Sequence, residues 1–423
     1  MKQQMDNILE IGFELLETHP EVFLKAYKVP SYNDEPTIFQ YNILFKDKDE
    51  EGSHPAVATG TSFTQTIALK KAFGEMIERY SLSAIEQDIL RKKSYAQDSR
   101  MLNPRKFISF SPELLKNMGV GRRKLEESKY TWVKCNDVQT NKSYLIPAQL
   151  VYVPYKYRSE EFTLQASNSS GAACGMSLED AIYRGICELI ERDSFLISYL
   201  NKLDCNRIDL DSIKDKQIQD MLRRITRYNL EVHLIITTKD VPVFSICAIV
   251  LDRTGIGPAV SVGLRAGFDK KEVIIGSLEE ALMTRSWTRD DYTKNQKQKF
   301  PSIGDIRKIE DRAYYWFSTK MIKNLDFWLK SGNFISLDLN PGKHSDHNDN
   351  FKKLLEIFKK KKIECYFVMI TSKMFNKYPV YVVKTIAPTL LSMYLDERYP
   401  NIYNARLKKH GKLPINSIPH PFL

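Results

Sequence analysis

The stretch Glu188-Leu-Ile-Glu191-Arg192 repeats a pattern that occurs earlier in the chain as Glu75-Met-Ile-Glu78-Arg79. Both copies lie in segments whose apolar residues recur with helical periodicity, 64–83 and 177–200. Because residues three and four positions apart share one face of an α-helix, each copy places two carboxylates and one guanidinium within a single turn. These two predicted helices are the starting point for both the fold and the function.

The rest of the chain alternates helical segments with short β-branched runs, which predicts an α+β fold with β-sheets flanked by helices. Residues 1–55 begin with an amphipathic helix and are expected to be an extension packed on the core. No long Gly/Ser-rich or Pro-rich linker divides residues 56–423, so we expect one catalytic domain that ends in a Pro-rich tail. Further helices are predicted at 271–285 and 312–329, and strands at 131–135, 143–152, 230–237, 243–251, 259–264, 365–370 and 380–385.

The composition predicts a folded cytoplasmic protein. Of the 423 residues, 43% are hydrophobic, yet no stretch is long and apolar enough for a membrane span, and the N-terminus lacks the apolar core of a signal peptide. The six cysteines are scattered, as expected for reduced thiols. The net charge of +11 is compatible with an anionic ligand or partner, but the basic runs lack interleaved aromatics, which favours a solvated surface over nucleic-acid binding. The sequence His344-Ser-Asp346-His347 lies between turn formers and is predicted to be a polar loop rather than a metal site.

A single Glu-x-x-Glu-Arg on a surface helix is usually a salt-bridge ladder, but the second helix argues against this interpretation. Its other faces are apolar, and the small residues Ala181 and Gly185 precede Glu188 on the same stripe, where they let a ligand approach. Four carboxylates from two helices repel one another unless a cation neutralises them. Mg2+ takes carboxylate oxygens and completes its shell with water and phosphate, and arginines suit the remaining phosphate oxygens. The pattern therefore predicts a nucleotide site in a chain that has no Walker-type loop.

Two further segments are candidates for this site. The hydroxyl-rich turn 167–177 precedes the second helix and ends at Ser177, a predicted N-cap, so its backbone amides could approach a ligand. The other candidate segment runs from Glu280 to Arg285. Arg285 could join the phosphate cluster or cap the C-terminus of a helix.

These motifs resemble the YcaO family. The carriers of the resemblance are the two Glu-x-x-Glu-Arg helices, the turn from Ser170 to Gly175, and the block from Gly263 to Arg285. The sequence departs from the family pattern at Lys71-Ala72, at Gly60-Thr-Ser62 and at Met283, without loss of a core carboxylate. The resemblance implies a YcaO-type fold with ATP and Mg2+ between two long helices. It assigns Mg2+ to Glu75, Glu78, Glu188 and Glu191, and ATP to these residues together with Arg79, Ser170, Arg192 and Arg285.

The end of the chain is similar to the proline-rich tail of the azoline-forming members of the family, the D-protein type. Its prolines include Pro419 and Pro421, and Leu423 stands where the last proline is expected. Alternating prolines hold an extended strand at low entropic cost. The resemblance implies that this tail reaches the active site, where the terminal carboxylate of Leu423 could act as a base.

The resemblance implies a cyclodehydratase of bacteriocin-type peptide biosynthesis. The side chain of a Cys, Ser or Thr in a ribosomally made precursor peptide adds to the preceding carbonyl, the resulting oxygen attacks the γ-phosphate of ATP, and loss of phosphate leaves a thiazoline or oxazoline. A separate E1-like protein would bind the leader peptide, a flavin dehydrogenase could oxidise the rings, and a homodimer is the family expectation. The alternatives are a YcaO enzyme that forms thioamides and a catalytically silent scaffold of a peptide-modifying complex.

Overall fold

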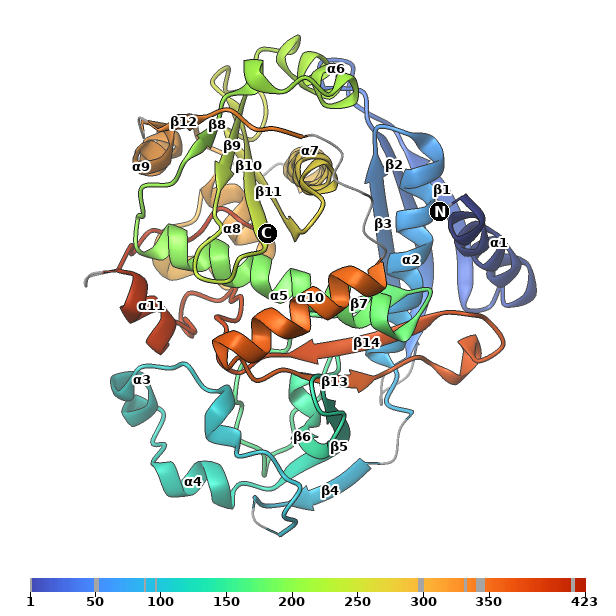
Figure 1. Ribbon diagram of the computed structural model, residues 1–423, viewed down its shortest axis with the longest axis vertical. Helices are drawn as coiled ribbons and strands as arrows, with labels where there is room; N and C mark the ends of the chain where they lie inside the picture. Colours follow the sequence, from blue (N-terminus) through green and yellow to red (C-terminus); the bar gives the residue numbers. More distant parts are fainter. Residues whose placement is uncertain are drawn as a thin grey trace.

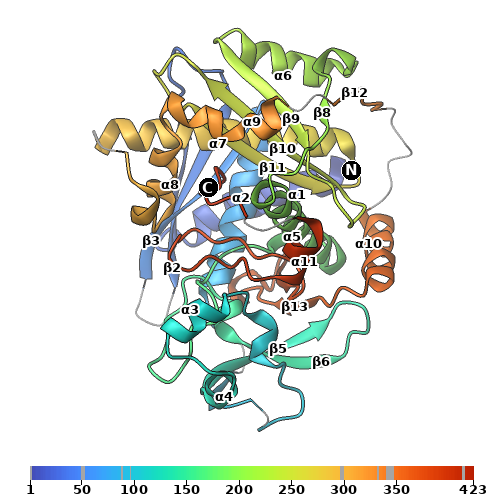
Figure 2. The same cartoon turned by 90° about the vertical axis from the view of Figure 1, so that its left-hand side faces the viewer.

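Three β-sheets surround a central group of helices in this protein, as a computed structural model shows (Figure 1). The structure describes residues 2–48, 53–86, 89–95, 97–295, 300–330, 333–339, 347–411 and 415–423. Helices α2, α5 and α7 each pack on a different sheet, and Figure 2 shows the same elements from the side. The fold is mixed helix and sheet, as the sequence predicted.

The first sheet is antiparallel, in the order β1-β2-β3, and it carries α2 (Gln65–Ser83). Its strands are β1 (Phe23–Val29), β2 (Phe39–Lys48) and β3 (Ser53–Ser62), and α1 (Lys2–Thr18) packs beside α2. A side chain at Gly60 would begin 2.0 Å from the carbonyl oxygen of Ala68, so the glycine lets α2 lie directly on β3. The predicted boundary between residues 55 and 56 falls inside β3.

The second sheet has the order β11-β10-β9-β8-β12, and α7 (Lys270–Asn295) covers its β10 and β11 strands. Nearly every residue of β10 is buried, because this strand lies between two helical layers. The strands are β8 (Arg207–Ile208), β9 (Leu230–Ile236), β10 (Phe244–Asp252), β11 (Val260–Gly267) and β12 (Phe334–Ile335), with α6 (Lys216–Thr226) against β9.

The third sheet has the order β4-β5-β13-β14-β7, with β6 paired to β5. Helix α5 (Leu178–Leu200) packs on β7 and β14, and it also contacts β11 of the second sheet, so it joins the two sheets. Ser177 caps this helix by accepting a hydrogen bond from the backbone of Asp180, which confirms the predicted N-cap. The strands are β4 (Ile89–Lys93), β5 (Tyr130–Asp137), β6 (Ser143–Pro147), β7 (Ala172–Gly175), β13 (Tyr366–Met369) and β14 (Tyr381–Ile386).

Smaller helices fill the periphery, and α10 packs on α5. They are α3 (Pro112–Asn117), α4 (Arg122–Glu127), α8 (Ile309–Tyr315), α9 (Asp326–Leu329), α10 (His347–Lys361) and α11 (Ala405–His410).

Most predicted elements are confirmed, with three corrections. The helix predicted at 312–329 is wrong, because the chain turns after Tyr315 and Ser318 caps a new 3-10 segment, Thr319–Leu325. The strand predicted at 143–152 ends at Pro147, and the helix predicted at 271–285 continues to Asn295. Strands β1 to β4, β7, β8 and β12 had not been predicted. The loop at 344–346 lies outside the described residues, and residue 347 begins α10.

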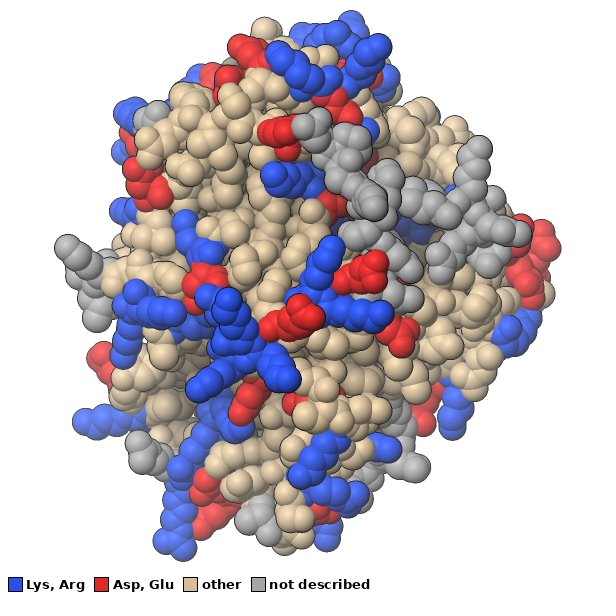
Figure 3. All heavy atoms as spheres, in the orientation of Figure 1, with Lys and Arg blue, Asp and Glu red and all other residues tan. Residues whose placement is uncertain are grey.

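Surface and composition predictions can also be compared with the structure. None of the described helices has the length and apolar character that a membrane crossing needs. All six cysteines are free, and five of them are buried. Lysines and arginines are scattered with acidic residues over the face in Figure 3, and a dense basic group lies over the end of α10, which carries Lys359, Lys360 and Lys361.

Candidate active site

Three glutamates, one from each central helix, accept a hydrogen bond from a backbone N–H of the sheet beneath. Thr59 of β3 donates to Glu75 at 3.0 Å, and Gly171, next to β7, donates to Glu188 at 3.2 Å. Leu264 of β11 donates to Glu280 in the same way. The same contact on three sheets fixes three carboxylates where the helices meet.

Arg192 joins the carboxylates of α5 to that of α7. Its guanidinium lies 3.2 Å from Glu188, 3.0 Å from Glu191 and 4.0 Å from Glu280. The side chain of Glu191 is 5% exposed, whereas Glu188 and Glu280 are 26% and 24% exposed. The cluster is therefore held by protein on one side and open to a ligand on the other. Glu280 had not been predicted as a site residue, although it begins the candidate segment 280–285.

The carboxylates of the two motifs interact across the helices. Burial, reinforced by the charges of Glu188 and Glu75, raises the pKa of Glu78 to about 8. Burial also raises the pKa of Glu75, and the charge of Glu188 adds to this shift. Burial also raises the pKa values of Glu191 and Glu280, although the charge of Arg192 opposes the rise. Like charges held together in this way are costly unless a cation joins them.

The donor set fits Mg2+, because it consists of carboxylate oxygens. In the described part of the chain, however, no three Asp, Glu, His or Cys side chains stand close enough to form a metal site by themselves. Such a set suits an ion that keeps water and takes phosphate oxygens from a nucleotide. The residues that would hold it are the paired glutamates of α2 and α5, which the sequence analysis named.

Lys384 of β14 is a member of the cluster that the sequence analysis missed. It is 2% exposed and donates a hydrogen bond of 2.6 Å to the carbonyl of Asn168. Burial lowers its pKa to about 8, while the charges of Glu188 and Glu78 oppose the shift. A buried ammonium beside two carboxylates acts as their internal counter-ion. Only the residue type could have indicated it, because a lysine inside a β-branched strand is unusual.

The turn before α5 brings Ser170 to the cluster through its neighbour Gly171. The backbone of Gly171 has φ +83°, and a side chain there would begin 2.4 Å from the carbonyl oxygen of Thr385. Only glycine satisfies both conditions, so the turn is shaped to present its N–H to Glu188. The N–H of Ser170 itself donates to the side chain of Asn168 at 3.1 Å.

Arg79 and Arg285 differ in their exposure and in their contacts. Arg79 is 49% exposed and has one long contact, 3.4 Å, with Glu75, so it can reach a ligand. Arg285 is 3% exposed and binds Glu35, Asp252 and the carbonyl of Pro258. The expectation that Arg285 binds phosphate is corrected, because its donors already bind buried acceptors. It does not cap a helix either, since α7 continues for ten residues beyond it.

The tail reaches this cluster. The ring of Phe422 lies over the guanidinium of Arg192, 3.9 Å from it, and both Figures 1 and 2 place the C-terminus near α5 and α7. The carbonyl of Pro419 accepts hydrogen bonds from the side chains of Tyr199 and Trp316. The carbonyl of His420 accepts one from Arg312 at 2.9 Å. Pro421 is buried and Leu423 is partly exposed.

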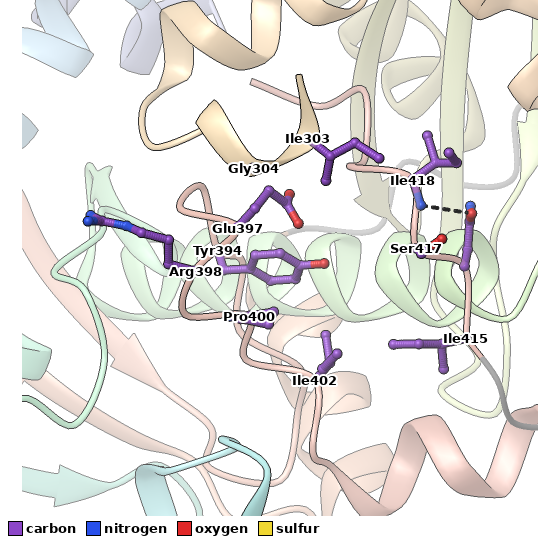
Figure 4. Close-up of a pocket in the computed structure, with 11 residues that line it drawn as sticks. Ile303, Gly304, Tyr394, Glu397, Arg398, Pro400, Ile402, Ile415, Ser417 and Ile418 are labelled. Atoms are coloured by element: carbon purple, nitrogen blue, oxygen red, sulfur yellow. Dashed lines mark hydrogen bonds between the residues drawn. The ribbon is translucent and has the colours of Figure 1, made fainter. Parts of the chain in front are cut away.

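A pocket of about 310 Å3 lies beside the base of the tail (Figure 4). One wall is the tail segment 415–418, and the other is the segment 394–402, from which the ring of Tyr394 points inward. Arg312 ties the two walls together, because it also binds Glu397 at 2.6 Å. None of the predicted site residues lines this pocket, so its role is separate from that of the carboxylate cluster.

The sequence matches a known family of proteins. The sequence model described as "YcaO cyclodehydratase, ATP- and Mg2+-binding" matches residues 59–391. The chain belongs to the YcaO family. The expected cofactors ATP and Mg2+ are confirmed by this membership. Two curated relatives are an uncharacterized protein of Methanothermobacter thermautotrophicus, 24% identical over 62% of the chain, and an uncharacterized protein in the tfuA 3' region of Rhizobium leguminosarum bv. trifolii, 30% identical over 42%. The matches cover 66% and 45% of these relatives.

Solved structures share the fold of this YcaO protein. A heterocyclase in complex with substrate and cofactor superposes with a TM-score of 0.74 and 17% identity, over 97% of this chain and 57% of that one. YcaO from Methanopyrus kandleri bound with AMPPCP and Mg2+ gives a TM-score of 0.65 and 15% identity, over 93% of each chain. A chain of the E. coli microcin synthetase McbBCD complex gives 0.63 and 16% identity, over 93% and 96%. These likenesses confirm the predicted YcaO-type fold.

Proposed function

We propose that this YcaO protein is an ATP- and Mg2+-dependent cyclodehydratase that forms thiazoline or oxazoline rings from Cys, Ser or Thr residues of a precursor peptide. The observation that carries the proposal is the contact between the tail and the cluster, the ring of Phe422 over Arg192. It joins the part of the chain that resembles azoline-forming enzymes to the carboxylates that suit Mg-ATP.

Each group of residues has a role in this proposal. Mg-ATP, when bound, supplies the phosphoryl group that converts the amide oxygen into a leaving group. Glu75, Glu78, Glu188 and Glu191 hold the metal, with Glu280 as a further carboxylate. Arg79 and Arg192 bind phosphate oxygens, and fixed charges of this kind stabilise a moving phosphoryl group without reorganisation. The tail orients Arg192, and the terminal carboxylate of Leu423 remains our predicted base.

The proposed partners follow from the same reasoning. The solved McbBCD synthetase complex with pro-MccB17 bound contains a chain of this fold, at 16% identity and a TM-score of 0.64. We therefore expect a precursor peptide, a separate E1-like protein that binds its leader, and a flavin dehydrogenase where the rings are oxidised. Homodimerisation stays a prediction.

Product mass tests the proposal. The chain is incubated with Mg-ATP, a Cys-bearing precursor peptide and its E1-like protein from the same gene neighbourhood. Loss of one water per ring, with stoichiometric phosphate release, is expected. An exchange of oxygen for sulfur in the presence of a sulfur donor would instead show a thioamide-forming enzyme. Activity that is unchanged in Glu191→Gln would show that the chain is a scaffold, because this glutamate is buried in the cluster.

A further inference from the structure

Arg265 is the one long side chain on the face of β11 that packs against α7. The other residues of this face, which alternate along the strand, are Ser261, Gly263 and Gly267. A side chain at Gly263 would begin 2.1 Å from the carbonyl oxygen of Ser277, which shows how closely the helix approaches. Arg265 can therefore fit only where α7 leaves a gap.

Gly276 of α7 provides this gap. A Cβ at Gly276 would lie 3.1 Å from Cγ and Cδ of Arg265 and 3.2 Å from its Nε, so the arginine stem crosses the helix at a position without a side chain. Gly276 and Glu280 are four residues apart and share one face of α7. Leu264, the residue before Arg265, donates its N–H to Glu280. The Arg265 side chain thus passes the helix on the face that carries the cluster.

The guanidinium of Arg265 is available to a ligand. The side chain is exposed, and within the described ranges no ion pair or hydrogen bond of its guanidinium is seen. Its charge nevertheless reaches the cluster, where it opposes the rise that burial causes in the pKa of Glu191 and of Glu280. Arg285, by contrast, is not available to a ligand, because it is buried and its donors bind Glu35 and Asp252.

We propose that Arg265, seated over Gly276, is a phosphate-binding residue of the ATP site and takes the role that the sequence analysis gave to Arg285. A guanidinium fork matches the oxygens of a phosphate group. Arg265 would complete a set with Arg79 of α2 and Arg192 of α5, so that each central helix has one arginine beside its glutamates. This inference rests on the proposed Mg-ATP site.

Calorimetric titration of the full chain with Mg-AMPPCP tests the inference without need of a peptide substrate. Arg265→Gln should weaken binding about 10- to 100-fold, the range for loss of a charged hydrogen-bonding group. The affinity of Arg265→Lys for Mg-AMPPCP should lie between those of Arg265→Gln and the original protein. The same substitutions should weaken the binding of AMP less, because AMP lacks the outer phosphates. The matched control is Arg223→Gln on α6, where the side chain is 73% exposed and pairs with its helix neighbour Asp220.

A second variant tests whether the Arg265 side chain depends on the absence of a side chain at Gly276. Gly276→Ala should displace the stem of Arg265 and weaken Mg-AMPPCP binding, and in the double variant with Arg265→Gln the loss should be no larger than in Arg265→Gln alone. If the losses of binding free energy in the two single variants add in the double variant, Gly276 does not act through Arg265 and this part of the inference is wrong. If the original chain binds and Arg265→Gln binds equally well, this inference fails while the proposed function stands. If the original chain does not bind Mg-AMPPCP, the proposed function fails. Thermal melting confirms that each variant is folded.

Discussion

The ring of Phe422 lies over the guanidinium of Arg192, with 3.9 Å between the guanidinium carbon and the ring centroid. Phe422 is 4% exposed and also contacts Phe195, which is one turn beyond Arg192 on α5. Arg192 in turn contacts Glu188 and Glu191. The tail therefore contacts the arginine of the second Glu-x-x-Glu-Arg motif directly, and we expect it to help orient that side chain.

Phe422→Leu should reduce the rate of ring formation about 5- to 30-fold, because leucine fills most of the volume but lacks the ring face that attracts the guanidinium. The rate at saturating peptide and ATP is the measurement. Phe300→Leu is the matched control, since Phe300 is 45% exposed. Equal rates for Phe422→Leu and the original protein would show that the tail contact is only structural.

Glu279 and Glu280 are neighbours on α7 for which opposite effects are expected. Glu279 is 3% exposed and binds Lys71 and Ser62, so Glu279→Gln should lower the melting temperature. Burial raises the pKa of Glu280 although the charge of Arg192 opposes the rise, and the charge of Glu188 adds to it. Glu280→Gln should therefore raise the melting temperature without Mg2+ and weaken Mg-AMPPCP binding about tenfold or more. The measurements are thermal melting and calorimetry. A lower melting temperature for both variants would contradict a cost of the buried charge at Glu280.

The sequence alone was sufficient to predict the two helices that carry the paired glutamates. Their periodicity is unbroken, and Ser177 caps α5, so α2 and α5 were predicted to within two residues of their ends. It was insufficient for the N-terminal sheet, because β1 and β3 contain lysine, histidine and glycine and show no clear alternation. β3 packs against α2 and β1 pairs with β2, so both strands depend on contacts with other segments of the chain.

The residues of the candidate site could be recognised from the sequence only where local helix geometry places them together. Spacing along one helix identified the Glu-x-x-Glu-Arg residues, which depend only on local geometry. Lys384 and Arg265 come from strands, and they join the cluster through sheet packing that sequence spacing does not encode. Arg285 was misplaced because its partner Glu35 lies 250 positions earlier, in a segment that had no predicted contact with α7.

Lys384→Met should destabilise the metal-free protein, because two carboxylates lose a buried counter-ion. The expected loss is about 3 to 5 kcal/mol, the range for removing one partner of a buried charged group. Mg2+ with AMPPCP should restore a larger share of the melting temperature in this variant than in the original protein, since the ligand replaces the missing charge. Lys377→Met, which removes an exposed lysine paired with Glu14, is the control. An equal ligand-induced shift in the original protein and in Lys384→Met would contradict the counter-ion role.

Asp240 links α11 to the core through Arg406, which also binds the buried Asp193 of α5 at 2.6 Å. Burial alone would raise the pKa of Asp240, but the hydrogen bonds and charge of Arg406 outweigh it and lower the pKa to about 2. This pKa is below the ordinary value of 3.8, so the carboxylate stabilises the fold above about pH 4 and loses its contribution as the pH falls toward 2.

Asp240→Asn should therefore lower the free energy of unfolding by about 1 to 2 kcal/mol at pH 7, and the difference from the original protein should shrink below pH 4. Urea unfolding midpoints measured from pH 7 to pH 3 provide the test. Asp290→Asn is the control, because Asp290 is 40% exposed and pairs with an exposed lysine, so its removal should have little effect at any pH. A difference that stays constant down to pH 3 would mean that Asp240 acts through packing and that its charge contributes little.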